Sequence, residues 1–257
     1  MKGVILAGGT GSRLHPLTRI TNKHLLPVYD KPMIFYPIET LVAAGIDELM
    51  VVTGGNHAGE FLPLLGNGRE FGLKRLQFSY QSQAGGIAEA LGLCEQFVDD
   101  SKVVVMLGDN ILGESIAPYV SNFESQAGGG RLLLKHMDEP SHLRHLGVPI
   151  FGKDDRLQYI REKPETPPSP YAVIGVYMYG PEVFDIVRTL RPSGRGELEI
   201  TDVNNAYIDR GLMAYDVISG FWGDAGESIE VYYQVIEQVQ RSGANHPHVA
   251  SAALAAA

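Results

Sequence analysis

The sequence has one cysteine, Cys94, and no apolar run approaches the roughly 18–20 residues that a helix needs to cross a bilayer. A single cysteine cannot form an internal disulfide, so a disulfide scaffold is excluded and a reducing compartment is expected. The apolar run before Gly8 has only four residues, 4–7, whereas the core of a signal peptide needs about 7–15. We therefore expect a cytoplasmic protein.

Positive charge is also scarce. The chain carries 21 Lys and Arg against 30 Asp and Glu, which gives a net charge of -9. An acidic protein has no general attraction for nucleic acid or for an anionic membrane, so neither is an expected partner. Small anionic ligands are not excluded, because a few local cations are enough to bind them.

Glycine, by contrast, is abundant. The 30 glycines among 257 residues are about 12% of the chain, against a usual ~7%. This indicates many tight turns or places where the backbone approaches a ligand. The hydrophobic share of 44% and charged share of 20% are typical of a globular protein of one large domain or two small ones.

The hydrophobic pattern predicts an α/β fold. Three short runs are apolar throughout and end in glycines or in Gly-Asp: residues 4–7, 49–52 and 103–107. Helical patterns separate or follow them: 32–45, 86–98 and 115–126. Such strands belong to a parallel sheet that is covered on both faces. We predict a doubly wound, mostly parallel, Rossmann-like sheet with helices on both faces, and a ligand site beyond the strands' carboxyl ends.

The second half of the chain is less regular. Prolines and charged residues over 138–170 predict loops and short strands. A strong strand pattern follows at 171–179, and helices are expected at 199–211 and 226–241. The Ala-rich residues 243–257 have no periodic pattern, so we expect a frayed tail there.

The strongest local signal is a glycine loop, LAGGTGSRLHP at residues 6–16. Its glycines allow successive N–H groups to surround a phosphate, and Arg13 adds a cation. Two known phosphate motifs do not fit. The GxxxxGK[ST] motif fails because position 9 is Gly, and the GxGxxG fingerprint of hydride-transfer enzymes lacks its third glycine.

This loop and the segment NKHLLPV at 22–28 together resemble the signature of the sugar-phosphate nucleotidyltransferases. The resemblance covers roughly residues 1–240 and is greatest to members that attach a thymidylyl group to glucose 1-phosphate. It implies dTTP and glucose 1-phosphate as substrates, Mg²⁺ as cofactor and a homo-oligomer, dimer or tetramer. We expect one domain over 1–242, with a nucleotide-binding part at about 1–135 and a smaller α+β sugar-phosphate-binding part at about 136–225.

The resemblance also implies roles for individual residues. The nucleotide is assigned to Leu6, Gly8, Gly9, Gly11, Arg13, Gln83, Gly86 and Asp109, and the sugar phosphate to Lys23, Gly147, Glu162, Lys163, Val173 and Arg195. Catalysis is assigned to Arg13, Lys23, Asp109 and Lys163, and the metal to Asp109 and Asp224. Asp224 lies in the family's W-x-D-x-G pattern, with Trp222 and Gly226.

Two of these assignments depend on local geometry. An amide can read a base edge, since it offers a donor and an acceptor, and Gln81 competes with Gln83 for that role because the loop is shorter than in longer members. Glu162 and Lys163 are adjacent in REKP. On an extended segment they point to opposite faces, so we expect them to serve two parts of a ligand rather than to pair.

Alternatives follow from the same features. The first alternative is a UTP-dependent or other nucleotidyltransferase of this fold, and the loop around Gln83 is the feature that distinguishes it. A non-catalytic sugar-nucleotide sensor is expected to lack the cations and carboxylates that this chain retains. Two departures from the longer members matter: residues 145–148 read HLGV where those have Arg-Tyr-Gly before the valine, and their C-terminal helical extension is missing. We therefore expect weak or absent feedback inhibition through a site built on that extension.

Overall fold

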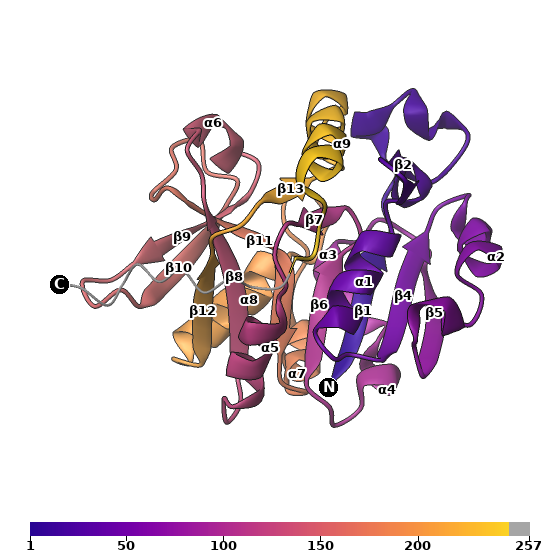
Figure 1. Ribbon diagram of the computed structural model, residues 1–257. Helices are drawn as coiled ribbons and strands as arrows, with labels where there is room; N and C mark the ends of the chain where they lie inside the picture. Colours follow the sequence, from indigo (N-terminus) through magenta and orange to yellow (C-terminus); the bar gives the residue numbers. More distant parts are fainter. Residues whose placement is uncertain (247–257) are drawn as a thin grey trace.

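The computed structural model describes residues 1–246 and is built on a nine-stranded sheet with helices against both faces (Figure 1). The parallel half contains β5 (Arg75–Gln81), β4 (Glu48–Gly54), β1 (Lys2–Ala7) and β6 (Val103–Leu107), in that order. β11 (Tyr171–Tyr179) runs antiparallel to β6 and starts the second half. That half is completed by β8 (Gly130–His136), β9 (Gly147–Phe151), β10 (Leu157–Glu162) and β12 (Met213–Ile218).

Alternation along the strands explains why both faces are covered. In β1, Val4 and Leu6 enter one hydrophobic core, while Ile5 and Ala7 enter the other. The first core is covered by α3 (Ile87–Gly92), α4 (Glu95–Val98), α7 (Val183–Thr189) and α8 (Ile200–Asp209). The second is covered by α1 (Phe35–Ala43), α2 (Phe61–Leu65) and α5 (Ala117–Glu124).

Smaller elements stand above the carboxyl end of the parallel strands. The yellow helix α9 (Ile229–Ser242) packs beside the indigo hairpin of β2 (Pro27–Val28) and β3 (Lys31–Pro32) (Figure 1). β7 (Asn110–Leu112) pairs with β13 (Trp222–Asp224), and α6 (Pro140–Leu143) precedes β9. Short 3₁₀ helices are η1 (Ser12–Leu14), η2 (Leu17–Arg19), η3 (Lys23–Leu25), η4 (Ala58–Glu60) and η5 (Arg69–Phe71).

The fold class predicted from the sequence is confirmed, with local corrections. The sheet is mixed, because β11 pairs antiparallel with β6, β8 and β9. The helix expected over 32–45 begins at Phe35, since Lys31 and Pro32 pair with the preceding strand. The helix expected over 86–98 is two short helices, with Cys94 at the N-cap of the second.

The fraying expected from residue 243 is wrong for residues 243–246. The Asn245 and His246 amides donate to the carbonyls of Leu112 and Gly113, and the Ser115 amide donates to the carbonyl of His246. The segment thus bonds to the chain at and just after the end of β7, and His246 forms a parallel bridge with Glu114. Residues 247–257 lie outside the described part of the chain. No helix within 1–246 is long and apolar enough to cross a membrane.

Candidate functional site

A cavity of about 360 Å³ opens where β1 and β6 end beside β11. Its wall includes thirteen of the fifteen residues that the sequence assigned to ligands or metal: Leu6, Gly8, Gly9, Arg13, Lys23, Gly86, Asp109, Gly147, Glu162, Lys163, Val173, Arg195 and Asp224.

 Gly11 and Gln83 are the two exceptions within the described chain. Side chains from elements that are far apart in the sequence therefore meet around one space.

The glycine loop forms the wall at the end of β1. Gly8 and Gly9 line the cavity, and Gly9 has a left-handed φ of 89° that favours glycine. Gly11 lies behind the wall, where an added Cβ would be 2.9 Å from Thr18 and 3.3 Å from Lys23. Gly11 thus leaves room for the loop to fold back, and Arg13 in η1 reaches the cavity.

Lys23 and Asp109 form an ion pair in the floor of the cavity. Lys23 Nζ donates to Asp109 Oδ2 at 2.5 Å, and Asp109 is only 6% exposed. Burial alone would lower the pKa of Lys23, but the nearby carboxylates of Asp109 and Asp224 outweigh it and raise that pKa. Burial would raise the pKa of Asp109, but Lys23 holds it below its usual range. Both groups are therefore charged at neutral pH.

Asp224 reaches the same floor from β13. Its strand pairs with β7, so that Asp224 lies opposite Asn110, and the Ala225 amide donates to the Asp109 carbonyl at 2.9 Å. Burial and the charge of Asp109 raise the pKa of the Asp224 carboxyl. Gly226 keeps the space open, because an added Cβ would lie 2.3 Å from Asp109 Oδ2.

This donor set fits a divalent cation. Two carboxylates face one space, and their mutual repulsion is only partly offset by Lys23. Magnesium sites that also bind phosphates commonly use one or two carboxylates and take their other ligands from water and the substrate. Within residues 1–246 no three His, Cys, Asp or Glu side chains gather as a metal cluster, so a cation here would need ligands from outside the protein.

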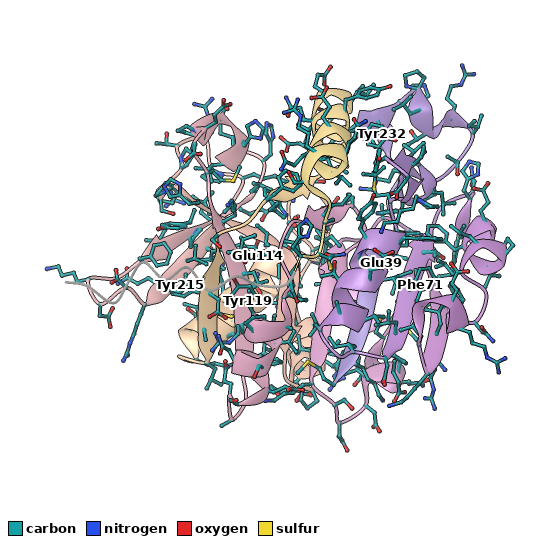
Figure 2. The ribbon with its side chains drawn as sticks, in the orientation of Figure 1. Glu39, Phe71, Glu114, Tyr119, Tyr215 and Tyr232 are labelled. Carbon is teal, nitrogen blue, oxygen red and sulfur yellow. The ribbon has the colours of Figure 1, made fainter. Side chains whose placement is uncertain are left out.

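A buried carboxylate outside the cavity holds β13 in position. Glu114 accepts hydrogen bonds from Tyr119 on α5, from Ser219 and from the Gly220 amide. Figure 2 labels Glu114 and Tyr119. Residues 219 and 220 lead directly into β13. Glu114 therefore fixes the segment that carries Asp224.

The opposite end of the cavity holds the assigned sugar-phosphate residues. Glu162 ends β10, and Lys163 follows with a left-handed φ of 43°. This turn brings both side chains into the cavity, with Lys163 Nζ 3.5 Å from Glu162 Oε1. The expectation that they point apart and do not pair is therefore wrong, since it assumed an extended backbone through Lys163.

Arg195 completes this end. Its guanidinium donates to Glu199 at 2.8 Å and lies 3.5 Å from Glu162. Thr201 on α8 donates to the second oxygen of Glu162 at 2.6 Å. The two cations Lys163 and Arg195 can neutralise a phosphate, while Glu162 is an acceptor for hydroxyl groups.

The structure separates the two glutamines that competed for the base. Gln81, the last residue of β5, is 8% exposed and lines the cavity. Gln83 is exposed and does not contribute to the cavity wall formed by the described residues. Of the two glutamines, Gln81 at the end of β5 therefore belongs to the cavity wall, and Gln83, two residues after the strand, does not.

Other residues of the wall were not identified from the sequence. His24 is buried beside Lys23, and its Nδ1 lies 2.7 Å from Asn22 Oδ1. Asn110 bonds to Asp109, to the Gly175 amide and to the indole of Trp222. His24 lies within NKHLLPV but was given no role, and Asn110 directly follows Asp109, so its position next to a predicted ligand was a usable signal. Further wall residues are Tyr177, Glu197, Glu199, Thr201 and Asn204.

Comparisons with known proteins agree with this geometry. A family model described as nucleotidyl transferase matches residues 2–242. A glucose-1-phosphate thymidylyltransferase of an Actinoplanes strain is 46% identical over 229 residues, which cover 88% of this chain and 74% of that protein. The enzyme of the same name from Neisseria meningitidis is 38% identical over 245 residues, covering 93% and 84%.

Solved structures show the same likeness. A Bacillus anthracis protein described as a glucose-1-phosphate thymidylyltransferase, crystallised with sucrose, has a TM-score of 0.87 and 46% identity, covering 93% of this chain and 95% of that one. A UDP-glucose pyrophosphorylase bound to UDP-glucose shares the fold at a TM-score of 0.79 and 22% identity, covering 93% and 98%. Since the family model spans nearly all of the described residues and these relatives cover most of its length, the chain belongs to the nucleotidyl transferase family.

Proposed function

We propose that the chain transfers a thymidylyl group from dTTP to glucose 1-phosphate, releasing pyrophosphate and forming dTDP-glucose. One observation carries the proposal: a glycine loop, a buried Lys–Asp–Asp cluster and a pair of phosphate-binding cations line a single cavity. The relatives that share 38–46% identity with the chain bear this activity in their names.

The reaction is an in-line displacement at the α-phosphorus. An oxygen of glucose 1-phosphate forms the new P–O bond, the bond between the α-phosphorus and its bridging oxygen breaks, and pyrophosphate leaves with that electron pair. The attacking phosphate is ionised at neutral pH, so no general base is needed. The protein therefore acts by holding two mutually repelling anions close together and by neutralising their charge.

Each end of the cavity serves one substrate. Gly8, Gly9 and Arg13 bind the triphosphate, and Lys23 neutralises charge between the two phosphates. Lys163 and Arg195 bind the sugar phosphate, and Glu162, with Gly147 and Val173 beside it, accepts hydrogen bonds from the hexose. Gly11 supports the loop from behind rather than touching the nucleotide.

We propose Mg²⁺ as the cofactor, held by Asp109 and Asp224. When bound there it supplies positive charge that neutralises the triphosphate. Lys23 can move from Asp109 toward a phosphate oxygen, because its side chain lines the cavity and is 19% exposed.

The pyrimidine of dTTP is assigned to Gln81 and Gly86. Both lie at the base of the turn between β5 and α3, and Gly86 has a φ of 99° that only glycine adopts readily. This replaces Gln83 as the residue that reads the base.

The organisation of the molecule is proposed from the same resemblance. One domain spans 1–242, with a nucleotide part at about 1–135 and a sugar-phosphate part at about 136–225, and the protein forms a homo-oligomer in the cytoplasm. The match of one family model over residues 2–242 supports the single domain.

The test measures pyrophosphate release. The protein is mixed with dTTP, glucose 1-phosphate and MgCl₂, and EDTA is added in a parallel sample. We expect release that depends on both substrates and stops with EDTA. Asp109→Asn is expected to reduce kcat about 100-fold or more, whereas Lys163→Ala is expected mainly to raise the KM for glucose 1-phosphate. Tight binding of dTDP-glucose without any release of pyrophosphate would indicate a sensor instead.

A further inference from the structure

The amide of Gln81 is held between two groups that only accept hydrogen bonds. Gln81 Nε2 donates to the Gly86 carbonyl at 3.1 Å and to Glu89 Oε2 at 2.5 Å. A glutamine amide nitrogen carries two hydrogens, so both are used. Gln81 comes from the end of β5, and Glu89 lies in the first turns of α3.

These partners allow only one orientation of the amide. A rotation by 180° would place Gln81 Oε1 against a carbonyl oxygen and a carboxylate oxygen, which repel it and offer no hydrogen. The amide oxygen is therefore turned the other way, toward Gly8, where an added Cβ would lie 3.0 Å from Oε1. Gly8 and Gln81 both line the cavity.

We infer that Glu89 is a positioning residue for base selection: it fixes Gln81 so that the side chain offers the nucleobase an acceptor and no donor. The inference rests on the proposed function, because it takes the cavity beside Gly8 as the site of the base. Glu89 lies outside the cavity wall formed by the described residues and acts through Gln81.

The chemistry of pyrimidines gives this orientation a consequence. Thymine and uracil carry a hydrogen on ring N3, which can donate to Gln81 Oε1. Cytosine has a lone pair on ring N3, which would face that oxygen without a hydrogen between them. A site with a fixed acceptor therefore selects dTTP over dCTP, since the wrong base leaves a buried polar group unpaired. The arrangement does not distinguish thymine from uracil at this atom.

The test replaces Glu89 by glutamine. In E89Q the new side chain can donate as well as accept, so only the Gly86 carbonyl still opposes rotation of the Gln81 amide, and the orientation that presents its NH₂ group to the cavity becomes populated. We expect the ratio of kcat/KM for dTTP to that for dCTP to fall about tenfold. A role limited to stabilising the fold would lower both values together and leave the ratio unchanged, and that result would overturn the inference.

Two controls complete the experiment. Glu95→Gln removes a comparable carboxylate from the surface of α4, where it pairs with Arg188, and is expected to leave the ratio unchanged. In a Gln81→Ala background, E89Q is expected to have no further effect on the ratio, because the group it positions is gone. If E89Q changed the ratio as much in that background as in the wild type, Glu89 would act through a residue other than Gln81.

Affinity measurements test this inference independently of the proposed function. The affinities of dTTP and dCTP are measured by calorimetry for wild-type and E89Q protein, without glucose 1-phosphate. A preference for dTTP that falls in E89Q supports the inference even if no pyrophosphate is released in the turnover assay. Equal affinity of the wild-type protein for the two nucleotides overturns it, whatever the outcome of that assay.

Discussion

At the scale of single residues, Gly226 determines whether the charged cluster can form. Lys23 and Asp109 meet at 2.5 Å in the space that a side chain at position 226 would fill. An added Cβ would lie 2.3 Å from Asp109 Oδ2 and 2.9 Å from Lys23 Nζ. The carboxylate is buried and cannot move into solvent, so the whole ion pair would shift.

We therefore expect Gly226→Ala to reduce kcat/KM about 100-fold, because small misplacements of catalytic groups have effects of that size. The matched control is Gly59→Ala, since a Cβ at that position meets nothing within 4 Å. Steady-state kinetics at several Mg²⁺ concentrations makes the comparison. Unchanged kinetics in Gly226→Ala would show that the cluster tolerates displacement.

His24 makes a prediction about pH. Burial, assisted by the charge of Lys23, lowers the pKa of His24 from 6.5 to about 3. In the unfolded chain the imidazole takes up a proton below about pH 6.5, while in the folded protein it remains neutral. Protonation therefore favours the unfolded state, and the free energy of unfolding falls as pH decreases below 6.5.

The expected loss from this one group is about 1.4 kcal/mol for each pH unit between 6 and 4. Urea unfolding at pH 7, 6 and 5 measures the slope for the wild type and for His24→Gln. The difference between the two free energies of unfolding should shrink as pH falls, because only the wild type loses stability through His24. The other titrating groups are common to both proteins. Parallel curves would mean that His24 takes up its proton in the folded state.

At the scale of elements, the buried strands could be predicted from the sequence. The runs at 103–107 and 171–179 coincide with β6 and β11, because a strand covered on both faces is apolar throughout. β5 and β12 are edge strands whose side chains are partly exposed, so their sequences lack that signal. The antiparallel pairing of β11 joins segments that are far apart in the sequence, so no local sequence pattern predicts it.

The site residues also divide into those that the sequence could identify and those that it could not. Asp109 and the glycine loop were identified because each follows a recognisable strand. The choice between Gln81 and Gln83 could not be made from spacing, since residues two apart in a strand point to the same face. In the structure β5 ends at Gln81, opposite Gly54 of β4, and of the two glutamines it is Gln81 that lines the cavity. The turn at Lys163 could not be predicted either, because its positive φ occurs at a lysine and not at a glycine.

At the scale of the whole molecule, one sheet joins the two proposed parts. β6 belongs to the nucleotide part and β11 to the sugar-phosphate part, and they pair over Val103–Met106 and Val176–Tyr179. The backbone of Leu198, in the sugar-phosphate part, also bonds to Gly85 and Ala88 of the nucleotide part. Neither part can separate without breaking these bonds and exposing the core that both share.

This continuity predicts one cooperative unfolding transition rather than two. Trp222, the single tryptophan of the chain, lies in the cavity wall between the parts, so its fluorescence reports the junction, while far-UV circular dichroism reports all helices. The two signals should change at the same urea concentration. Adding dTTP with Mg²⁺ at 100 times its dissociation constant should raise the free energy of unfolding by about 2.7 kcal/mol in both signals together. A dichroism curve with two steps, or a ligand shift confined to one of them, would show that the parts fold independently and that the paired strands β6 and β11 do not couple them.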